Sequence, residues 1–265
     1  MSKNIKPLNN NELRVKEPTL FTSEPHSEVS DKYHFIPTID VIEEIRANNW
    51  YPVNVSVANV RDEEKEGFQQ HCVRFRHFED LLNPKDNAVE LLLFNSHDRS
   101  KAFSISAGIF RFVCANGLVI SDSVFETYKI KHLGERDNDV ANAVANITAI
   151  KPKLMEKINK LESITLNQSE KESFAKYSIP LRFEEHLEIN HNDLLIPHRV
   201  EDSKDDLYTV LNVIQENLLR GNISGINKDT KRRFTSKEIT SISKDTEVNK
   251  GIWDIAEKIA SIKDS

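Results

Sequence analysis

One segment of the chain, between residues 220 and 237, has residue types that suit the binding of a polyanion. Its cations are Arg220, Lys228, Lys231, Arg232, Arg233 and Lys237. With Asp229 as the one carboxylate, these six cations give the segment a net charge of +5; the whole chain has a formal net charge of −6, which leaves −11 on the rest. Lysine and arginine neutralise phosphates, and a ring such as Phe234 can stack on a base. The segment therefore predicts a nucleic-acid-binding loop, and the alternative is a solvated basic loop.

A second, shorter basic run lies between residues 74 and 78. Arg74, Arg76 and His77 are accompanied there by Phe75 and Phe78. Because cations and rings occur together in both runs, we expect Arg74 and Arg76 to contribute to the same groove as the loop.

Two groups of acidic residues and histidines raise the question of metal-dependent catalysis. They are the pair His97-Asp98 and a cluster of Glu184, Glu185, Glu188, His191 and Asp193. Two-metal nucleases use such residue types, but neither group has HxH, HExxH or CxxC spacing. The sequence also lacks a Walker-type phosphate loop, a dinucleotide glycine pattern and GxSxG. We therefore expect no cofactor, no metal and no catalytic residue, and a metal-dependent nuclease using His97, Asp98, Glu184 and Glu185 is the alternative.

The densest apolar region spans residues 89 to 122 and is interrupted by a polar turn. The turn consists of Asn95, Ser96, His97 and Asp98, whose side chains can bond to nearby backbone. This favours a structural role for the turn, with a binding role as the competitor. Asn116-Gly117 predicts a tight turn at the end of the next apolar segment, which reads as a strand over residues 103 to 112 or as a short helix from 107 to 115.

Several segments resemble a known family. They are FNSHD and FRFVCANGLV in the apolar region, and VLNVIQENLLRGN, KDTKRRFTSKEIT and VNKGIWDIAEKIA near the end. Together they resemble the phage- and plasmid-borne family catalogued as domain of unknown function nine-three-two, over roughly residues 33 to 262. The resemblance marks Asn95, Ser96, His97, Asp98, Asn116 and Gly117 as positions of the family motif. It implies little about mechanism.

The periodicity of the chain predicts an α+β fold, with an antiparallel β-meander, flanking helices and a helical C-terminal part. Strands are expected over residues 50–60, 70–78, 89–94, 103–112, 118–120 and 124–130. Helices are expected from Thr38, from Asp139 with a kink or a new start at Pro152, over 166–177, from Asp205 or Asp206 to Gly221, and over 248–259. We divide the chain into a flexible N-terminal arm (1–32), a mainly antiparallel β region (33–136) and a mainly helical region packed on it (137–265), which contains the basic loop.

The composition indicates a folded protein with a heavily charged surface. Hydrophobic residues make up 38% of the chain and charged residues 29%. The first residues lack the apolar core of a signal peptide, and no apolar run approaches the ~18 residues of a membrane span. We therefore expect a soluble protein in the cytoplasm of a bacterial host. Cys72 and Cys114 are expected to be buried reduced thiols.

The first functional hypothesis is a nucleic-acid-binding protein of a phage or plasmid, with single-stranded DNA as the favoured partner. A meander followed by helices is similar to the layout of ring-forming single-strand annealing proteins, which act in recombination and replication. We therefore expect a homo-oligomer, in which many weak sites act together on one strand. The alternatives are the nuclease and an interaction protein that inhibits a host defence system, whose mostly acidic surface mimics nucleic acid.

Overall fold

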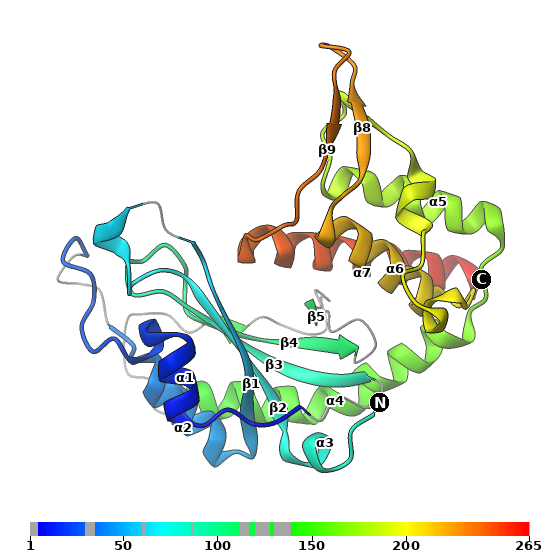
Figure 1. Ribbon diagram of the computed structural model, residues 1–265. Coiled ribbons are helices and arrows are strands. Elements are labelled where there is room, and N and C mark those ends of the chain that lie inside the picture. The colour runs from blue at the N-terminus through cyan, green and yellow to red at the C-terminus, as the bar shows by residue number, and fades with distance from the viewer. Residues whose placement is uncertain are drawn as a thin grey trace. The chain divides into compact units, whose positions relative to one another are not determined.

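The computed structural model describes residues 5–29, 35–59, 62–85, 87–111, 117–119, 128–129 and 139–264. It shows the predicted α+β fold, in which an antiparallel sheet precedes a mainly helical part (Figure 1). Backbone contacts divide the chain into two compact units. The first comprises residues 1–119 and 123–151, and the second comprises residues 120–122 and 152–265.

The large sheet of the first unit has the strand order β1-β2-β3-β4-β5, with β6 paired to β4, and every pair is antiparallel. The strands are β1 (Trp50–Val57), β2 (His71–His77), β3 (Asn87–Asn95), β4 (Ser104–Arg111), β5 (Gly117–Val119) and β6 (Tyr128–Lys129). The predicted meander is thereby confirmed. Because β4 continues to Arg111, a helix over residues 107–111 is excluded, whereas Asn116 of the predicted tight turn lies outside the described residues, as does Cys114. Cys72 is buried, as predicted.

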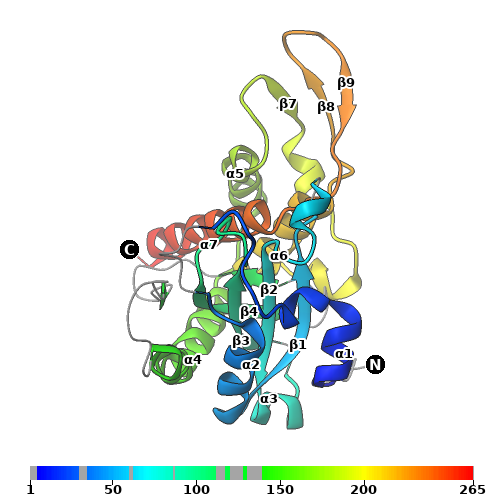
Figure 2. The same cartoon turned by 90° about the vertical axis from the view of Figure 1, so that its left-hand side faces the viewer.

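One face of this sheet forms the apolar core of the first unit. In register, Val73 lies opposite Leu93, and Leu93 lies opposite Ile105, so the three side chains share a face. All three are fully buried. Helix α2 (Thr38–Ala47), which is labelled in Figure 2, buries Val41, Ile42 and Ile45. The indole Nε1 of Trp50 donates to Thr148 Oγ1 of helix α4 (Asp139–Ser163) over 3.0 Å.

Residues near the N-terminus contain regular structure that the sequence reasoning did not find. Helix α1 (Asn10–Lys16) starts at a capping box formed by Asn9 and Glu12, and a short 3₁₀ helix, η1 (Pro18–Phe21), follows. Leu13 and Leu20 are fully buried, and the N–H of Leu8 donates to the carbonyl of Pro52 on β1 over 2.8 Å. This part of the predicted arm (1–32) therefore contains regular structure and packs on the first unit, and its flexibility stays a prediction.

Short 3₁₀ and α-helical turns also lie between the main elements. In the first unit they are η2 (Glu63–Lys65) and α3 (Phe78–Leu82). In the second unit they are η3 (Ile179–Leu181), η4 (His191–Leu195) and η5 (Val200–Ser203). The three turns of the second unit lie between the helix predicted over residues 166–177 and the one predicted from Asp205 or Asp206.

The second unit is mainly helical. Its long helices are α4 (Asp139–Ser163, whose first residues belong to the first unit), α5 (Gln168–Ser178), α6 (Leu207–Arg220) and α7 (Ile242–Lys263). Helix α4 continues through Pro152 as one element. None of the described helices has the length and apolar character needed to cross a membrane.

The second unit also holds a small antiparallel sheet in the order β7-β8-β9. Its strands are β7 (Leu187–Ile189), β8 (Ser224–Asn227) and β9 (Arg233–Thr235). None of these three strands is among those predicted from the sequence, which indicated a loop over residues 220–237. The basic segment is instead a β-hairpin.

The packing of α1 can be tested with two substitutions on the same helix. Leu13→Ala should lower the free energy of unfolding by about 2–5 kcal/mol, because it opens a cavity at a fully buried position. Val15→Ala should change it by no more than about 0.5 kcal/mol, because that side chain is 85% exposed. Urea unfolding of both variants provides the measurement, and equal, small effects would show that the N-terminal segment does not belong to the core.

Candidate nucleic-acid interface

The basic segment is organised by the β8-β9 hairpin, which extends beyond α6 and α7 (Figure 1). Ile226 lies opposite Arg233, and Ser224 lies opposite Thr235. At the tip, the side-chain Oδ1 of Asn227 accepts hydrogen bonds from the backbone N–H groups of Asp229 (3.0 Å) and Thr230 (2.9 Å). The short side chain of Asn227 thus closes the turn that presents the basic residues.

The base of the hairpin is held by a close approach of two backbones. Gly221 ends α6 with φ +76°, and a Cβ added there would lie 2.6 Å from the carbonyl carbon and oxygen of Lys237. The N–H of Asn222 donates to Ser236 O over 2.8 Å, and that of Ser236 donates to Ile223 O over 2.9 Å. Only glycine satisfies both the left-handed backbone and the missing space at residue 221.

The two faces of the small sheet differ in what they present. Phe234 is half-buried, and its ring centre lies 6.5 Å from that of Phe183. The opposite face carries Ser224, Ile226, Arg233 and Thr235, all exposed. The ring of Phe234 therefore packs partly within the second unit, and its stacking on a base stays a prediction.

The predicted cations lie around the hairpin. Those with exposed side chains and no carboxylate partner among the residues that the structure describes are Lys228, Lys231, Arg232, Arg233 and Lys237. Lys228 Nζ donates to the backbone carbonyl of Glu185 over 3.0 Å. Arg220 differs, because its Nη1 lies 2.7 Å from Oε1 of the buried Glu216. Five of the six predicted cations are therefore available to an external anion.

The chain at and beside the outer strands of the small sheet, β7 and β9 (Figure 2), carries opposite charges on the two sides. On the β9 side, Lys231, Arg232 and Arg233 are exposed. The β7 side has the exposed carboxylates Glu184, Glu185 and Glu188 instead. A phosphate chain is attracted to the β9 edge and repelled from the β7 edge.

Glu216 supports the end of α6 from which the hairpin starts. Its carboxylate accepts hydrogen bonds from Arg199 Nη1 (2.6 Å) and Nη2 (2.8 Å), in addition to its ion pair with Arg220. Arg199 also contacts Asp202 over 2.9 Å. These bonds to Glu216, followed by those to Asp202, raise the pKa of Arg199 above its usual range. The sequence reasoning missed this network, because Glu216 and Arg199 belong to different elements.

Arg74 and Arg76 of the first unit do not form an open basic surface. Arg76 Nη2 and Arg74 Nε each lie 2.6 Å from a carboxylate oxygen of Glu90, which is itself buried. Both guanidinium groups lie over the ring of Phe110, at 4.8 and 4.4 Å from its centre. Arg76 is fully buried and both guanidinium groups pair with the one carboxylate of Glu90, so the contact of these arginines with nucleic acid stays a prediction that their surroundings do not favour.

The polar turn of the family motif is part of the core of the first unit. Asn95, Ser96 and His97 are fully buried. Asn95 Nδ2 donates to Thr38 Oγ1 over 3.0 Å, and His97 Nε2 lies 3.4 Å from the same oxygen. Asp98 Oδ1 accepts from the N–H of Ser100 over 2.9 Å; burial opposes ionisation of this carboxyl, but its hydrogen bonds lower its pKa overall.

His71 joins the same cluster, with its Nε2 2.8 Å from Thr38 Oγ1 and its ring centre 5.1 Å from that of His97. Burial, assisted by the neighbouring His97, lowers the pKa of His71 to about 3. The imidazole is therefore neutral near pH 7. These contacts favour the structural role predicted for the turn.

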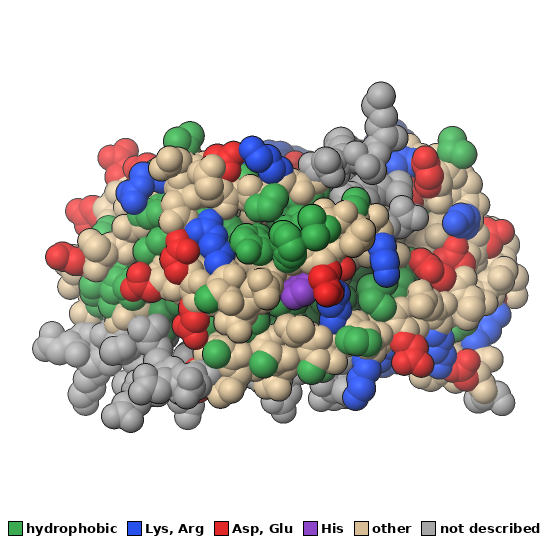
Figure 3. Space-filling model, turned by 90° about the horizontal axis from the view of Figure 1, so that it is seen from below, with side chains coloured by type: hydrophobic (Ala, Val, Ile, Leu, Met, Phe, Trp, Pro, Cys, Tyr) green, Lys and Arg blue, Asp and Glu red, His purple; other side chains and the backbone are tan. Residues whose placement is uncertain are grey.

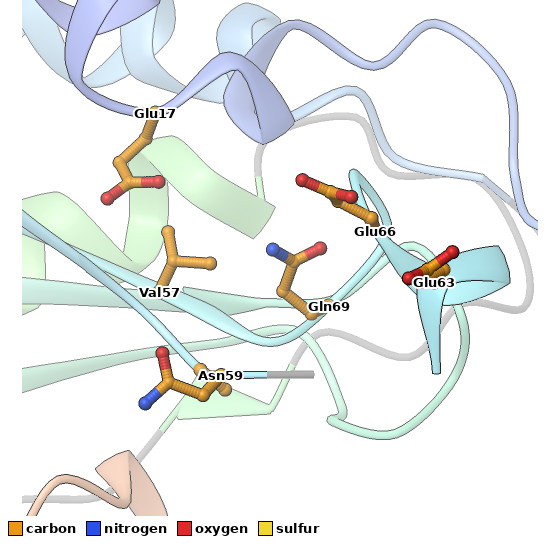
Figure 4. A pocket seen from close by; sticks show the side chains of 7 residues that line it. Glu17, Val57, Asn59, Glu63, Glu66 and Gln69 are labelled. Carbon is orange, nitrogen blue, oxygen red and sulfur yellow. The ribbon is translucent and has the colours of Figure 1, made fainter. Parts of the chain in front are cut away.

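A pocket of about 470 Å³ in the first unit is lined partly by Glu17, Glu63 and Glu66 (Figure 4). Burial raises the pKa of Glu17. The negative charge of the lining makes this pocket unsuitable for phosphate. Among the described residues, no group of histidine, cysteine and carboxylate side chains is arranged to hold a metal ion, and Glu184 and Glu185 are exposed.

The surface drawn in Figure 3 carries side chains of both charges. In the view of Figure 3, acidic and basic side chains are interspersed among hydrophobic ones. The hairpin, by contrast, carries Lys231, Arg232 and Arg233 in direct succession. This concentration of one charge marks it as the candidate interface.

The fold and the hairpin define an α+β protein with an exposed basic ribbon. The chain belongs to the family described as domain of unknown function (DUF932), whose model matches residues 25–253. It is similar to the UPF0380 proteins YfjQ and YafZ of Escherichia coli (strain K12). Each is 30% identical over 255 residues, which cover 96% of this chain and 92% of the relative. No solved structure matches the chain.

The buried histidine cluster should make stability depend on pH. An unfolded histidine has a pKa of about 6.5, whereas folded His71 stays neutral down to about pH 3. The unfolded chain therefore binds the extra proton between these values, and stability should fall as pH falls from 6.5, by up to about 1.4 kcal/mol per pH unit. Urea unfolding at pH 7.5, 6 and 5 measures this. His71→Gln should show a shallower dependence, and an unchanged dependence would contradict the assignment to His71.

The close approach at Gly221 can be separated from backbone strain alone. Gly67 has a φ of +88° but no atom within 4 Å of an added Cβ, so Gly67→Ala should cost only about 1–2 kcal/mol of stability. Gly221→Ala should cost more, because its Cβ would also overlap the backbone of Lys237. Thermal unfolding of the two variants gives the comparison. An equal loss in both would show that the hairpin base has room that the structure does not indicate.

Proposed function

We propose that the protein binds nucleic acid by holding its phosphate backbone against the β8-β9 hairpin. The observation that carries this proposal is the group of exposed cations at the hairpin, which have no carboxylate partner among the described residues. Elsewhere in the chain the cations Arg74, Arg76 and Arg199 are paired with buried carboxylates. Unpaired cations on a projecting ribbon can replace the counterions of a polyanion, and this release of counterions favours binding.

The contacts are expected to be with the backbone rather than with the bases. Besides the cations, the hairpin exposes the hydroxyl groups of Ser224, Thr230 and Thr235, which can donate to phosphate oxygens. The ring of Phe234 packs near Phe183 and is not positioned for stacking. Binding should therefore depend weakly on base sequence.

We propose single-stranded DNA as the preferred partner and several copies of the protein on one strand. A single hairpin supplies few phosphate contacts, so affinity at physiological salt requires that neighbouring copies act together. The resemblance to phage- and plasmid-borne proteins suits a role in recombination or replication of a mobile element. None of these contacts requires a catalytic residue.

The proposal is tested by changing Lys231, Arg232 and Arg233 together to Gln. These side chains are exposed, so the fold should be retained while affinity falls for every sequence tested. The slope of log affinity against log salt should become shallower by about 2–3, at roughly 0.7–0.9 per lost phosphate contact. Titrations with single-stranded DNA, duplex DNA and RNA over a salt series provide the measurement.

A matched control removes the same charge elsewhere in the second unit. Lys176, Lys204 and Lys258 are exposed, and changing all three to Gln alters the net charge equally. This control should leave the salt slope near that of the parent. If the hairpin variant binds all three nucleic acids as tightly as the control does, the hairpin is only a solvated surface and the proposal fails.

A further inference from the structure

Arg182 occupies an unusual position at the base of the hairpin. It directly follows η3, and its Nη2 donates to the backbone carbonyl of Lys237, just beyond β9. Its guanidinium carbon lies 5.3 Å from the centre of the Phe183 ring. Nη1 is enclosed and has no hydrogen-bond partner among the residues that the structure describes. One guanidinium nitrogen, Nη1, is thus enclosed, while the other, Nη2, contacts the hairpin.

Other largely buried arginines form ion pairs with carboxylates. Arg46 pairs with Glu43 at 2.8 Å, and Arg199 pairs with Glu216 at 2.6 Å. Arg74 and Arg76 share Glu90. Arg182 contacts no carboxylate in the described part of the chain, and burial lowers its pKa with no neighbouring charge to oppose the effect. It is therefore a partly buried cation without a counter-ion of its own.

Such a cation costs free energy unless an anion is supplied. Removing a guanidinium from water is unfavourable, and the loss is recovered only through ion pairs or hydrogen bonds. Arg182 has one backbone hydrogen bond, to Lys237, and a ring contact. Lys237, whose backbone carbonyl accepts this bond, has an exposed side chain that adds a second positive charge to the same part of the hairpin. The pair is chemically suited to an oxyanion such as phosphate.

We propose that Arg182 and Lys237 bind a backbone phosphate of the nucleic acid at the base of the hairpin. This inference rests on the proposed function, and it extends the contact from the tip of the hairpin to its base. A strand bound in this way lies along β9, past Thr235, toward Arg233. The five residues from Arg233 to Lys237 span about 13 Å (four steps of about 3.3 Å), enough for more than one phosphate of an extended strand. The carboxylates beside β7 keep the strand on the β9 edge.

The first test uses Arg182→Met, which keeps the length of the side chain and removes the charge. Its salt slope for single-stranded DNA should be shallower than that of the parent by about 0.7–0.9, the value for one lost phosphate contact. Lys237→Gln should have a similar effect, and it should fold because, within the described part of the chain, Lys237 makes hydrogen bonds through its backbone alone. Arg182→Lys should retain the parental slope. Lys176→Met removes an exposed charge on α5 and should leave the slope unchanged.

A second measurement uses inorganic phosphate in the absence of nucleic acid. At constant ionic strength, replacing chloride by phosphate should raise the melting temperature of the parent but not that of Arg182→Met. In chloride alone, Arg182→Met should melt at or above the temperature of the parent, because a cation without a counter-ion has been removed. If Arg182 only ties the hairpin to η3, Arg182→Met should instead melt lower and keep the parental salt slope, and that result would overturn the inference.

The outcomes separate this inference from the proposed function. If the triple variant at the tip binds like the parent, the proposed function fails. If the tip variant weakens binding while Arg182→Met and Lys237→Gln retain parental affinity and slope, the hairpin binds nucleic acid and the site at its base is disproved.

Discussion

The carboxylate of Glu216 is the interaction on which the end of α6 depends. It is 1% exposed, accepts hydrogen bonds from Arg199 and forms an ion pair with Arg220, and these two arginines lie on opposite sides of it in sequence. A buried carboxylate is tolerated only when its oxygens are satisfied, and here two arginines do so. Because Arg220 immediately precedes Gly221, the same carboxylate fixes the point at which the chain leaves the helix and enters the hairpin. The exposed cations thus follow a helix end at which Arg199 and Arg220 are paired with Glu216.

The large sheet was predictable from sequence because its strands alternate between a core face and a second face. Val73 and Phe75 on β2, and Leu91 and Leu93 on β3, show this period of two directly. The small sheet has no such signal. Strand β8 reads SGIN and strand β9 reads RFT, so each offers a single large apolar residue. Their pairing depends on β7, about 40 residues earlier in the chain, and only Asn227 at the tip gave a local turn signal.

Other differences arise from partners that spacing does not reveal. Asn9 and Glu12 form a capping box that can be recognised in sequence, but α1 buries only Leu13 and therefore lacks an apolar stripe. Arg74 and Arg76 alternate in a visible strand pattern, yet their counter-ion Glu90 lies on the neighbouring strand. In both basic runs, residues 74–78 and 220–237, the sequence thus showed where cations are concentrated. Whether that charge faces solvent was decided by the strand register.

The opposite charges on the two outer strands of the small sheet have a consequence for the approach of a ligand. Carboxylates beside β7 and cations beside β9 give this sheet a permanent electric dipole directed across its strands. In the field of a polyanion a dipole experiences a torque, which turns its positive end toward the negative charge before any contact forms. Under the proposed function, the small sheet therefore orients the protein toward the polyanion as well as providing the site of contact. Dissolved salt shortens the range of this torque to about a Debye length, roughly 8 Å at physiological ionic strength.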